Sequence, residues 1–558
     1  MSPPSEHPTR QTGVELTLAQ QSAMVDALQA SLQAEHRDEP VQRYETHISF
    51  VLVAGGRAYK LKKAVTLDFL DFGSLSERHR LCLEELRLNR RLAPSLYLDV
   101  VPVTGTWQRP RFGGDGPMID AAVAMRAFPQ QGLWDRMAAR GELHGAHVDA
   151  LAAQLLAFHR EAAVAGAQGP LGHAAQVRQP MLDNLQALAA SADACLGPTL
   201  TPAALAALRE WEAAEFAALA PVFEARLHDG FVREGHGDLH LGNVAMVDGR
   251  VTVFDCIEFN EAFRWGDVVG EIAFLAMDLH AHGLPALAHR FVDACLEGSG
   301  DHAGARVLRW YLVYRALVRA KVAVLRAGQQ HGGDDGAVQR YLALAAGWCR
   351  APRPVLMITH GFSGSGKTTG AQAVLEAIGA VRIRADVERK RLFGLGSLDR
   401  SGSAPGAGLY SAEATAATYA QLLARARPVL AGGHHVILDA AFLSAAQRAD
   451  AQRFASSLGV QTVILSFEAD VDTLLARLLE RTTRADDASE ADAQVLALQT
   501  RTAQPLSDEE RMRTVPIGSG GVDGTVLDVL RLRLALAVGV DHGAPVALMP
   551  CGHHPPGG

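Results

Sequence analysis

The chain has 558 residues, enough for three to four units at about 150 residues per domain. Its 53 basic and 61 acidic side chains give a formal net charge of −8, which disfavours general nucleic-acid binding because the phosphate backbone attracts basic surfaces. No apolar run reaches the length of a membrane span and the six cysteines form no Cys-x-x-Cys pair, so we expect a cytoplasmic protein without a disulfide framework.

The two ends and one proline-rich junction divide the chain. Residues 1–15 and 542–558 lack apolar periodicity, and we expect both to be disordered. The segment Ala351-Pro352-Arg353-Pro354 follows a long helical pattern, and its prolines cannot continue a helix. We therefore predict a first domain over 16–350 and a second over 351–541.

A hairpin is the first element that suggests chemistry. Strand patterns over His47 to Val53 and Arg57 to Lys62 flank the turn Gly55-Gly56. Side-chain alternation places Lys60 and Lys62 on the same face of the second strand. One of these two lysines is expected to bind ATP phosphates.

A helix is predicted next, over Leu75 to Leu92, with Ser74 and Glu77 as a capping box at its start. Glu85 falls in the middle of its apolar face. A carboxylate in that position needs a cationic partner. We expect a hairpin lysine to pair with Glu85, and Glu84 is the alternative.

The stretch from His236 to Asn243 places an aspartate and an asparagine five residues apart. Phosphoryl transfer needs a carboxylate that accepts the proton of the attacking hydroxyl and oxygen ligands for the bridging metal. Strand patterns flank the turn Asp248-Gly249, and pairing across this turn brings Asn243 close to Asp255. Asp238, Asn243 and Asp255 therefore converge, and amide and carboxylate oxygens suit Mg²⁺.

The second domain alternates short strand patterns with helical ones, which predicts a parallel α/β sheet. Its first strand pattern, Val355 to Thr359, leads into a segment that fits GxxxxGK[ST]. The residues expected to bind nucleotide there are Gly361, Ser363, Gly364, Ser365, Gly366, Lys367, Thr368 and Thr369. Lys367 is expected to reach the β- and γ-phosphates, and Thr368 to coordinate Mg²⁺.

Four later side chains suggest what this nucleotide does. Asp386 follows a short strand pattern and could activate an acceptor hydroxyl. Asp439 ends the pattern His435 to Leu438, which is typical of a Walker B strand whose carboxylate approaches the metal. Arg481 and Arg484 lie on a predicted helix and its exit, where they could neutralise charge on the transferred phosphoryl group.

The first domain resembles the aminoglycoside phosphotransferase family, which has a choline-kinase-like, protein-kinase fold. The likeness lies in the motif around Asp238 and Asn243, the run Val253-Phe254-Asp255, and Gly266-Asp267 followed by Glu271. It implies Asp238 as catalytic base, Asn243 and Asp255 as Mg²⁺ ligands, and Asp267 as a brace for the catalytic loop. The sequence departs from protein kinases after Asp255, where Cys-Ile-Glu replaces Phe-Gly.

The second domain resembles small P-loop kinases of the polynucleotide-kinase and zeta-toxin group. This likeness implies Asp386 as a base or acceptor-binding residue and Arg481 and Arg484 as lid ligands. The tandem resembles bacterial proteins described as bifunctional aminoglycoside phosphotransferase and ATP-binding proteins. It implies an α+β protein-kinase-like domain followed by an α/β P-loop domain.

The resulting hypothesis is a phosphotransferase with two nucleotide sites that uses ATP and Mg²⁺. Its first site is expected to act on a small-molecule hydroxyl, with no membrane partner and no strong signal for nucleic-acid binding. The alternatives are an ATP-sensing regulatory protein, in which one domain binds nucleotide without transfer, and polynucleotide 5′-kinase activity in the second domain.

Overall fold

The structure is a computed structural model that describes residues 15–67, 70–191, 201–329, 335–350, 353–403, 407–484 and 488–538. The predicted disordered ends lie outside these ranges, apart from Glu15. Residue contacts divide the chain into two compact units, Met1–Arg350 and Ala351–Gly558. Within the described part of the chain, no helix combines the length and apolar character needed to cross a membrane.

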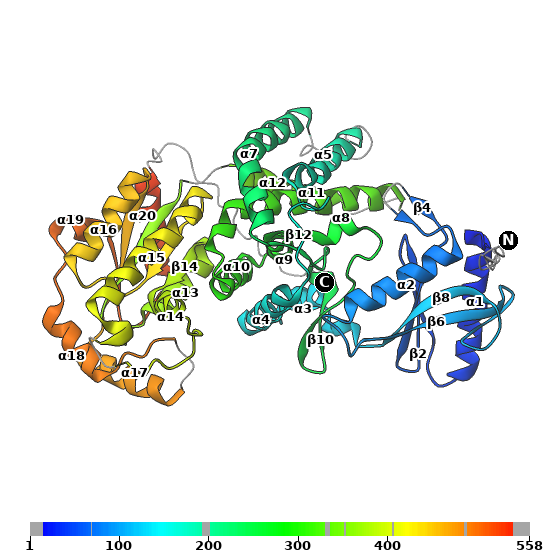
Figure 1. The fold of residues 1–558 in the computed structure, drawn as a ribbon, viewed down its shortest axis with the longest axis horizontal. Helices are drawn as coiled ribbons and strands as arrows, with labels where there is room; N and C mark the ends of the chain where they lie inside the picture. The colour runs from blue at the N-terminus through cyan, green and yellow to red at the C-terminus, as the bar shows by residue number, and fades with distance from the viewer. Residues whose placement is uncertain are drawn as a thin grey trace, which may run out of the picture. The chain divides into compact units, whose positions relative to one another are not determined.

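The first unit begins with an antiparallel sheet of six strands in the order β1-β2-β3-β8-β6-β7 (Figure 1). The strands are β1 (Gln42–Glu45), β2 (Ser49–Ala54), β3 (Arg57–Lys62), β6 (Tyr97–Thr106), β7 (Arg109–Phe112) and β8 (Met118–Arg126). Helix α1 (Leu18–Glu35) packs on one face with Leu61, and α2 (Leu75–Asn89) packs on the other. Because side chains alternate along β3, Lys60 and Lys62 face α2.

Helix α2 begins as its sequence predicts but with half of the expected cap. The Ser74 hydroxyl accepts a hydrogen bond from the Glu77 amide at 3.1 Å. The Glu77 carboxylate does not complete the capping box, because it accepts hydrogen bonds from Arg80 instead. A two-stranded hairpin of β4 (Thr66–Leu67) and β5 (Leu70–Asp71) precedes the helix.

The rest of the first unit is mainly helical and packs around α9 (Val268–Ala281), which is buried along most of its length. Its other helices are α3 (Trp134–Ala139), α4 (Gly145–Glu161), α5 (Ala174–Ala190), α7 (Pro202–His228), α8 (Glu261–Arg264), α10 (Pro285–Ser299), α11 (Ala305–Gln329) and α12 (Asp335–Cys349). Two short antiparallel pairs flank the segments that contain Asp238, Asn243 and Asp255. They are β9 (Val232–Glu234) with β12 (Trp265–Asp267) and β10 (Val244–Val247) with β11 (Arg250–Val253).

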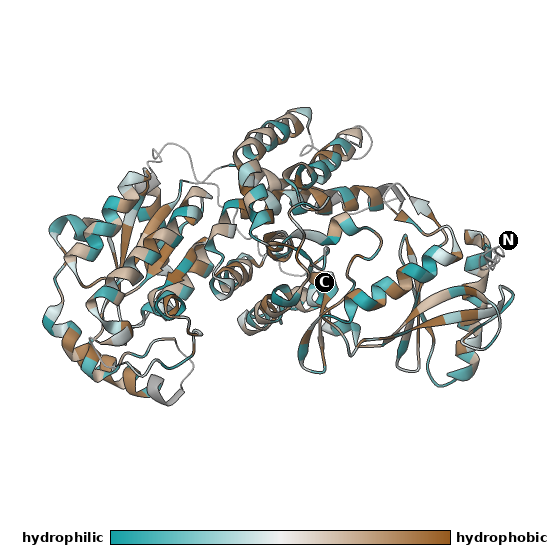
Figure 2. Cartoon of the chain, in the orientation of Figure 1, coloured by the Kyte–Doolittle hydropathy of each residue, from teal (hydrophilic) through white to brown (hydrophobic). Residues whose placement is uncertain are grey.

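The second unit contains a five-stranded parallel sheet in the order β14-β15-β13-β16-β17. Its strands are β13 (Val355–His360), β14 (Val381–Arg384), β15 (Val436–Asp439), β16 (Gln461–Phe467) and β17 (Thr514–Ile517). The sheet is drawn mainly in the brown of hydrophobic residues, because both of its faces are covered (Figure 2). The last strand is an addition to the four that the sequence pattern predicts.

The helices of the second unit are arranged on the two faces of this sheet. Helices α13 (Lys367–Ile378) and α20 (Gly524–Val538) share one core with the sheet, while α15 (Ala412–Ala431) and α16 (Ala445–Ser457) contact each other and the sheet. The remaining helices are α14 (Ala385–Leu392), α17 (Val471–Arg484), α18 (Ala493–Thr502) and α19 (Asp508–Met512). The parallel arrangement places the ends of β13, β14 and β15 at one edge.

Candidate functional sites

A cluster of two lysines and three carboxylates lies between β3, α2 and the segment after β11. Lys60 Nζ is 2.9 Å from Glu85 Oε1 and 2.5 Å from Asp255 Oδ1. Lys62 Nζ is 2.7 Å from Glu85 Oε2 and also donates to Glu258. Both hairpin lysines therefore contact Glu85, whose side chain is completely buried. Only Asp255 in this cluster is substantially exposed, at 43% of its side chain.

The alternative partner, Glu84, has a different role. Its carboxylate is 2.7 Å from Arg87 and 2.9 Å from Arg264. The carboxylate of Glu85 stays charged despite its burial. Burial alone would raise the pKa of Glu85, but Lys60 and Lys62 lower that pKa to about 2.

The predicted hairpin brings together the residues that the sequence assigns to a catalytic loop. The Asn243 side-chain amide donates to the Asp238 carbonyl at 2.9 Å and to Asp238 Oδ2 at 3.1 Å. The Phe254 amide donates to the Asn243 carbonyl at 3.0 Å. Asp255 follows Phe254 in the chain and therefore comes directly after the residue that pairs with Asn243. Asp255 adopts a left-handed backbone conformation with φ of 67°, and its amide donates to the Tyr97 hydroxyl at 3.2 Å.

The carboxylates that hold the loop from His236 to Asn243 differ from the brace that the family resemblance implies. Glu271 Oε1 accepts hydrogen bonds from the amides of His236 and Gly237, the second at 2.9 Å. Asp278 Oδ2 accepts from the Leu241 amide at 2.9 Å. The expected brace, Asp267, instead forms a buried ion pair with the Arg226 guanidinium and caps the start of α9.

Glu271 and Asp278 were not singled out as braces, although the sequence carries a signal for them. They are the two acidic residues in a 14-residue helix that is apolar apart from them and His280, and both are buried. A carboxylate on a helix that is apolar all round must find hydrogen-bond donors. What the sequence cannot supply is the identity of those donors, which include amides of a loop about 35 residues earlier and the Tyr341 hydroxyl.

Asp238 is held in its charged form by its neighbours. Burial alone would raise the pKa of Asp238, but His240, His236 and Arg319 lower it below its usual value. His240 Nε2 lies 3.4 Å from Asp238 Oδ2. Asp238 is therefore ionised at neutral pH and can accept a proton.

The loop between β13 and α13 is built on glycines that a side chain would disrupt. Gly364 and Gly366 have φ of 84° and 89°, and a Cβ added at Gly364 would lie 2.8 Å from a backbone oxygen of α17. Ser365 Oγ is buried without a hydrogen-bond partner in the described part of the chain. An orphaned hydroxyl beside glycine-rich backbone suits the oxygens of a phosphate.

Several groups predicted to bind nucleotide are engaged within the second unit. Lys367 Nζ donates to the Phe362 carbonyl at 2.7 Å, and the Ser363 amide donates to the Gln499 side chain at 2.8 Å. The predicted cradle also includes Gly361, whose φ is 148°, and Thr368 and Thr369 in the first turn of α13. A nucleotide would have to displace the contact made by Lys367.

The two aspartates predicted for the second site follow neighbouring strands. Asp439 ends β15 and is buried; its Oδ2 has no hydrogen bond from any described residue and lies 4.0 Å from Arg384 Nε. Asp386 lies in the first turn of α14, directly after β14. The side chains of Arg481 and Arg484, predicted as lid ligands, lie outside the described residues. From the same helix, α17, Arg477 donates to the Gly364 carbonyl at 3.4 Å.

Two family models match separate parts of the chain. Residues 58–311 match the model of the phosphotransferase enzyme family, and residues 356–506 match an AAA domain model. Among solved structures, a choline/ethanolamine kinase family protein from Mesorhizobium loti is 14% identical, covering 59% of this chain and 96% of that one with a TM-score of 0.39. The APS kinase of Mycobacterium tuberculosis is 20% identical, covering 32% of this chain and 98% of that one with a TM-score of 0.24.

The fold and the two family matches define a kinase-type phosphotransferase followed by a P-loop kinase-like domain. The predicted tandem, its fold class and its enzyme class are therefore confirmed. Uncharacterized proteins of Mycobacterium bovis and Mycobacterium tuberculosis are 33% identical over 465 residues, or 82% of this chain and 90% of theirs. The chain belongs to the same family as these mycobacterial proteins.

Proposed function

We propose that the chain binds ATP at two sites and that its first unit transfers the γ-phosphoryl group to a hydroxyl of a small molecule. The observation that carries this proposal is the convergence of Lys60, Glu85 and Asp255 with the Asp238 loop. These residues come from a strand, a helix and a hairpin that are far apart in the sequence.

The first site fits ATP with Mg²⁺. Asn243 uses its side-chain N–H group on Asp238, which leaves its amide oxygen available as a ligand. Together with the partly exposed carboxylate of Asp255, it forms a set of hard oxygen donors. Asn243 and Asp255 would hold Mg²⁺, which when bound would offset the charge of the phosphates, and Lys60 would contact those phosphates.

Asp238 is proposed as the catalytic base. It is ionised, and the Asn243 amide and His240 hold its carboxylate. Asp238 takes the proton of the acceptor hydroxyl while the hydroxyl oxygen bonds to the γ-phosphorus and ADP departs as the leaving group. Glu271 keeps the loop in place through the His236 and Gly237 amides.

The second unit is proposed to bind ATP on its glycine-rich loop. Ser365 and the glycines support a phosphate cradle, with Lys367 on the outer phosphates. Thr368 and Asp439 are proposed to hold Mg²⁺, since Asp439 Oδ2 accepts no hydrogen bond from any described residue and carboxylate oxygens suit this metal. Asp386 is proposed to bind or activate an acceptor, with Arg481 and Arg484 as lid ligands.

The test is transfer from radiolabelled ATP to a panel of small hydroxyl compounds and oligonucleotide 5′-ends. We expect Asp238→Asn to abolish product at the first site, because the amide cannot accept the proton. The matched control is Asp248→Asn, in the exposed turn of the same region, which should act as wild type. Full transfer by Asp238→Asn to every acceptor would refute the assignment.

A parallel variant separates the two sites. Lys367→Ala should weaken nucleotide binding at the second site and leave Asp238-dependent transfer in place. A product that is lost in Lys367→Ala but kept in Asp238→Asn would assign that acceptor to the second unit. If Lys367→Ala forms every product but its rate of transfer no longer responds to nucleotide at the second site, the ATP-sensing alternative is favoured.

A further inference from the structure

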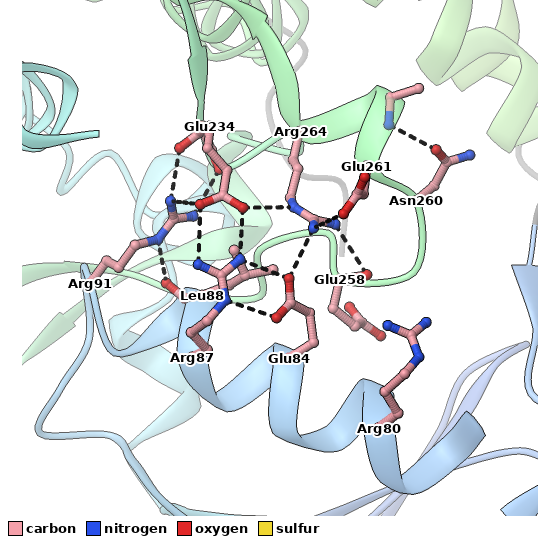
Figure 3. A network of polar contacts seen from close by, with 12 residues as sticks. Arg80, Glu84, Arg87, Leu88, Arg91, Glu234, Glu258, Asn260, Glu261 and Arg264 are labelled. Atoms are coloured by element: carbon pink, nitrogen blue, oxygen red, sulfur yellow. Dashed lines mark hydrogen bonds and ion pairs between the residues drawn. The ribbon is translucent and has the colours of Figure 1, made fainter. Parts of the chain in front are cut away.

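One buried arginine joins three of the segments that bear or adjoin the first-site residues. Arg264 ends α8, nine residues after Asp255, and only 3% of its side chain is exposed. Figure 3 shows its guanidinium between Glu84 of α2 and Glu234 of β9, with Nη2 2.9 Å from Glu84 Oε1 and Nε 3.2 Å from Glu234 Oε1. Its Nη1 also donates to the Glu258 carbonyl at 3.3 Å.

Two carboxylates that Arg264 contacts, Glu84 and Glu234, lie close in the chain to residues of the proposed site. Glu84 precedes Glu85, which holds the lysines. Glu234 lies two residues before His236, where the catalytic loop begins. Displacement of this guanidinium would therefore affect Glu85, the Asp255 segment and the Asp238 loop together.

Two further arginines of α2 and its exit strengthen the link to Glu234. Arg87 Nη2 is 2.7 Å from Glu234 Oε1, and Arg91 Nη1 is 3.1 Å from Glu234 Oε2 (Figure 3). Arg91 also donates to the Glu234 and Gly235 carbonyls at 2.8 and 3.0 Å. The three arginines are balanced by three carboxylates, since Glu84 and Glu261 join Glu234. Arg264 and Glu234 are the most buried members, with 3% and 9% of their side chains exposed, so their contact is the one that fixes the local geometry.

We propose that Arg264 is a positioning residue of the first site, holding α2, the segment after Asp255 and the catalytic loop in one arrangement. This inference rests on the proposed function, because it assumes that the first site binds MgATP. Arginine is needed because its planar fork reaches several acceptors in fixed directions, whereas a lysine ammonium is a single point charge. Arg264→Lys should therefore keep the positive charge but no longer hold α2, the segment after Asp255 and the catalytic loop in one arrangement.

The test measures how a fluorescent ATP analogue with Mg²⁺ binds to full-length Lys367→Ala protein, in which the second site is silenced. We expect Arg264→Gln and Arg264→Lys each to raise the dissociation constant about tenfold, since small misplacements of catalytic groups have effects of this order or larger. The matched control is Arg80→Gln, which removes an exposed pair with Glu77 on the same helix. It should bind as the parent does.

The dissociation constant separates positioning from simple loss of folding. Unfolded molecules lower the amplitude of the titration and leave the dissociation constant of the folded ones unchanged. If both Arg264 variants bind as tightly as Arg80→Gln, the inference is wrong. A parent protein that binds no nucleotide at its first site would overturn the proposed function as well. If the parent protein binds nucleotide at its first site but Asp238→Asn keeps full transfer, only the assignment of Asp238 as catalytic base is contradicted.

Discussion

Lys60 Nζ lies 2.5 Å from Asp255 Oδ1, although 195 positions separate the two residues in the chain. This contact joins the sheet of the first unit to the segment that follows the hairpin of β10 and β11. Glu85 contacts both Lys60 and Lys62, so Lys62 contributes to the same buried cluster.

Lys62→Met should destabilise the first unit strongly. Lys62 is 1% exposed and is paired with two buried glutamates, and Glu258 would be left without its cation. Breaking a buried ion pair on one side costs about 3 kcal/mol or more. Urea unfolding followed by tryptophan fluorescence measures this change selectively, because all six tryptophans precede residue 351.

The neighbouring Lys63→Met is the control for that experiment. Lys63 lies on the other face of the hairpin and pairs with Glu45, whose side chain is 49% exposed. A pair with an exposed partner contributes about 1 kcal/mol or less. Equal losses in the two variants would contradict the role given to the Lys62 cluster.

Tyr97→Phe should weaken the response of the first site to Mg²⁺. The Tyr97 hydroxyl accepts the hydrogen bond from the Asp255 amide and so helps to hold Asp255 in its left-handed conformation. Loss of one such hydrogen bond costs about 1 kcal/mol, which corresponds to about a fivefold higher Mg²⁺ concentration for half-maximal nucleotide binding. Tyr44→Phe, at an exposed tyrosine of the same unit, should leave the Mg²⁺ response unchanged.

Glu271→Gln should reduce the acid sensitivity of the first unit. Burial alone would raise the pKa of Glu271, but His159, His236 and the Gly237 amide lower it to about 2. A pKa that is depressed in the folded state stabilises the protein above the unfolded value near 4.5, and this contribution disappears as the pH falls toward 2. For wild type we expect the Glu271 contribution to decrease by about 2 kcal/mol between about pH 6 and pH 3.

The same urea titrations at several pH values measure this effect. Glu271→Gln cannot titrate at this position, so its free energy of unfolding should change less between the two pH values. Glu142→Gln, at an exposed glutamate, should keep the wild-type pH dependence. An unchanged pH dependence in Glu271→Gln would exclude Glu271 as a main source of acid sensitivity.

Gly364→Ala should impair nucleotide binding in the second unit. The added methyl group would lie 2.8 Å from the Leu474 carbonyl oxygen, so the loop or α17 must shift. Gly521→Ala is the matched control, because its φ of 82° imposes similar backbone strain but its added carbon meets nothing within 4 Å. The titration uses a fluorescent ATP analogue and protein that also carries Lys60→Met, which removes the proposed phosphate contact of the first site. In this background, Gly364→Ala should bind the analogue more weakly and Gly521→Ala should not.

Local chemistry made much of both units predictable. The turns Gly55-Gly56 and Asp248-Gly249 join the predicted hairpins, and β13 leads into the glycine-rich loop as expected. Alternation along β3 correctly placed Lys60 and Lys62 on one face, and the apolar face of α2 singled out Glu85. The fifth strand of the parallel sheet, β17, was missed because four residues containing a proline make a weak strand pattern.

The sequence by itself determined the two domain types and the residues of their local motifs, because turn residues, periodicity and motif spacing act over a few neighbouring positions. Only the tertiary structure decided which distant groups meet. It paired both lysines with Glu85, gave the loop-bracing role to Glu271 and Asp278, and placed Arg264 between Glu84 and Glu234. Buried charges must find partners, but the packing of helices and strands selects which partners lie within reach.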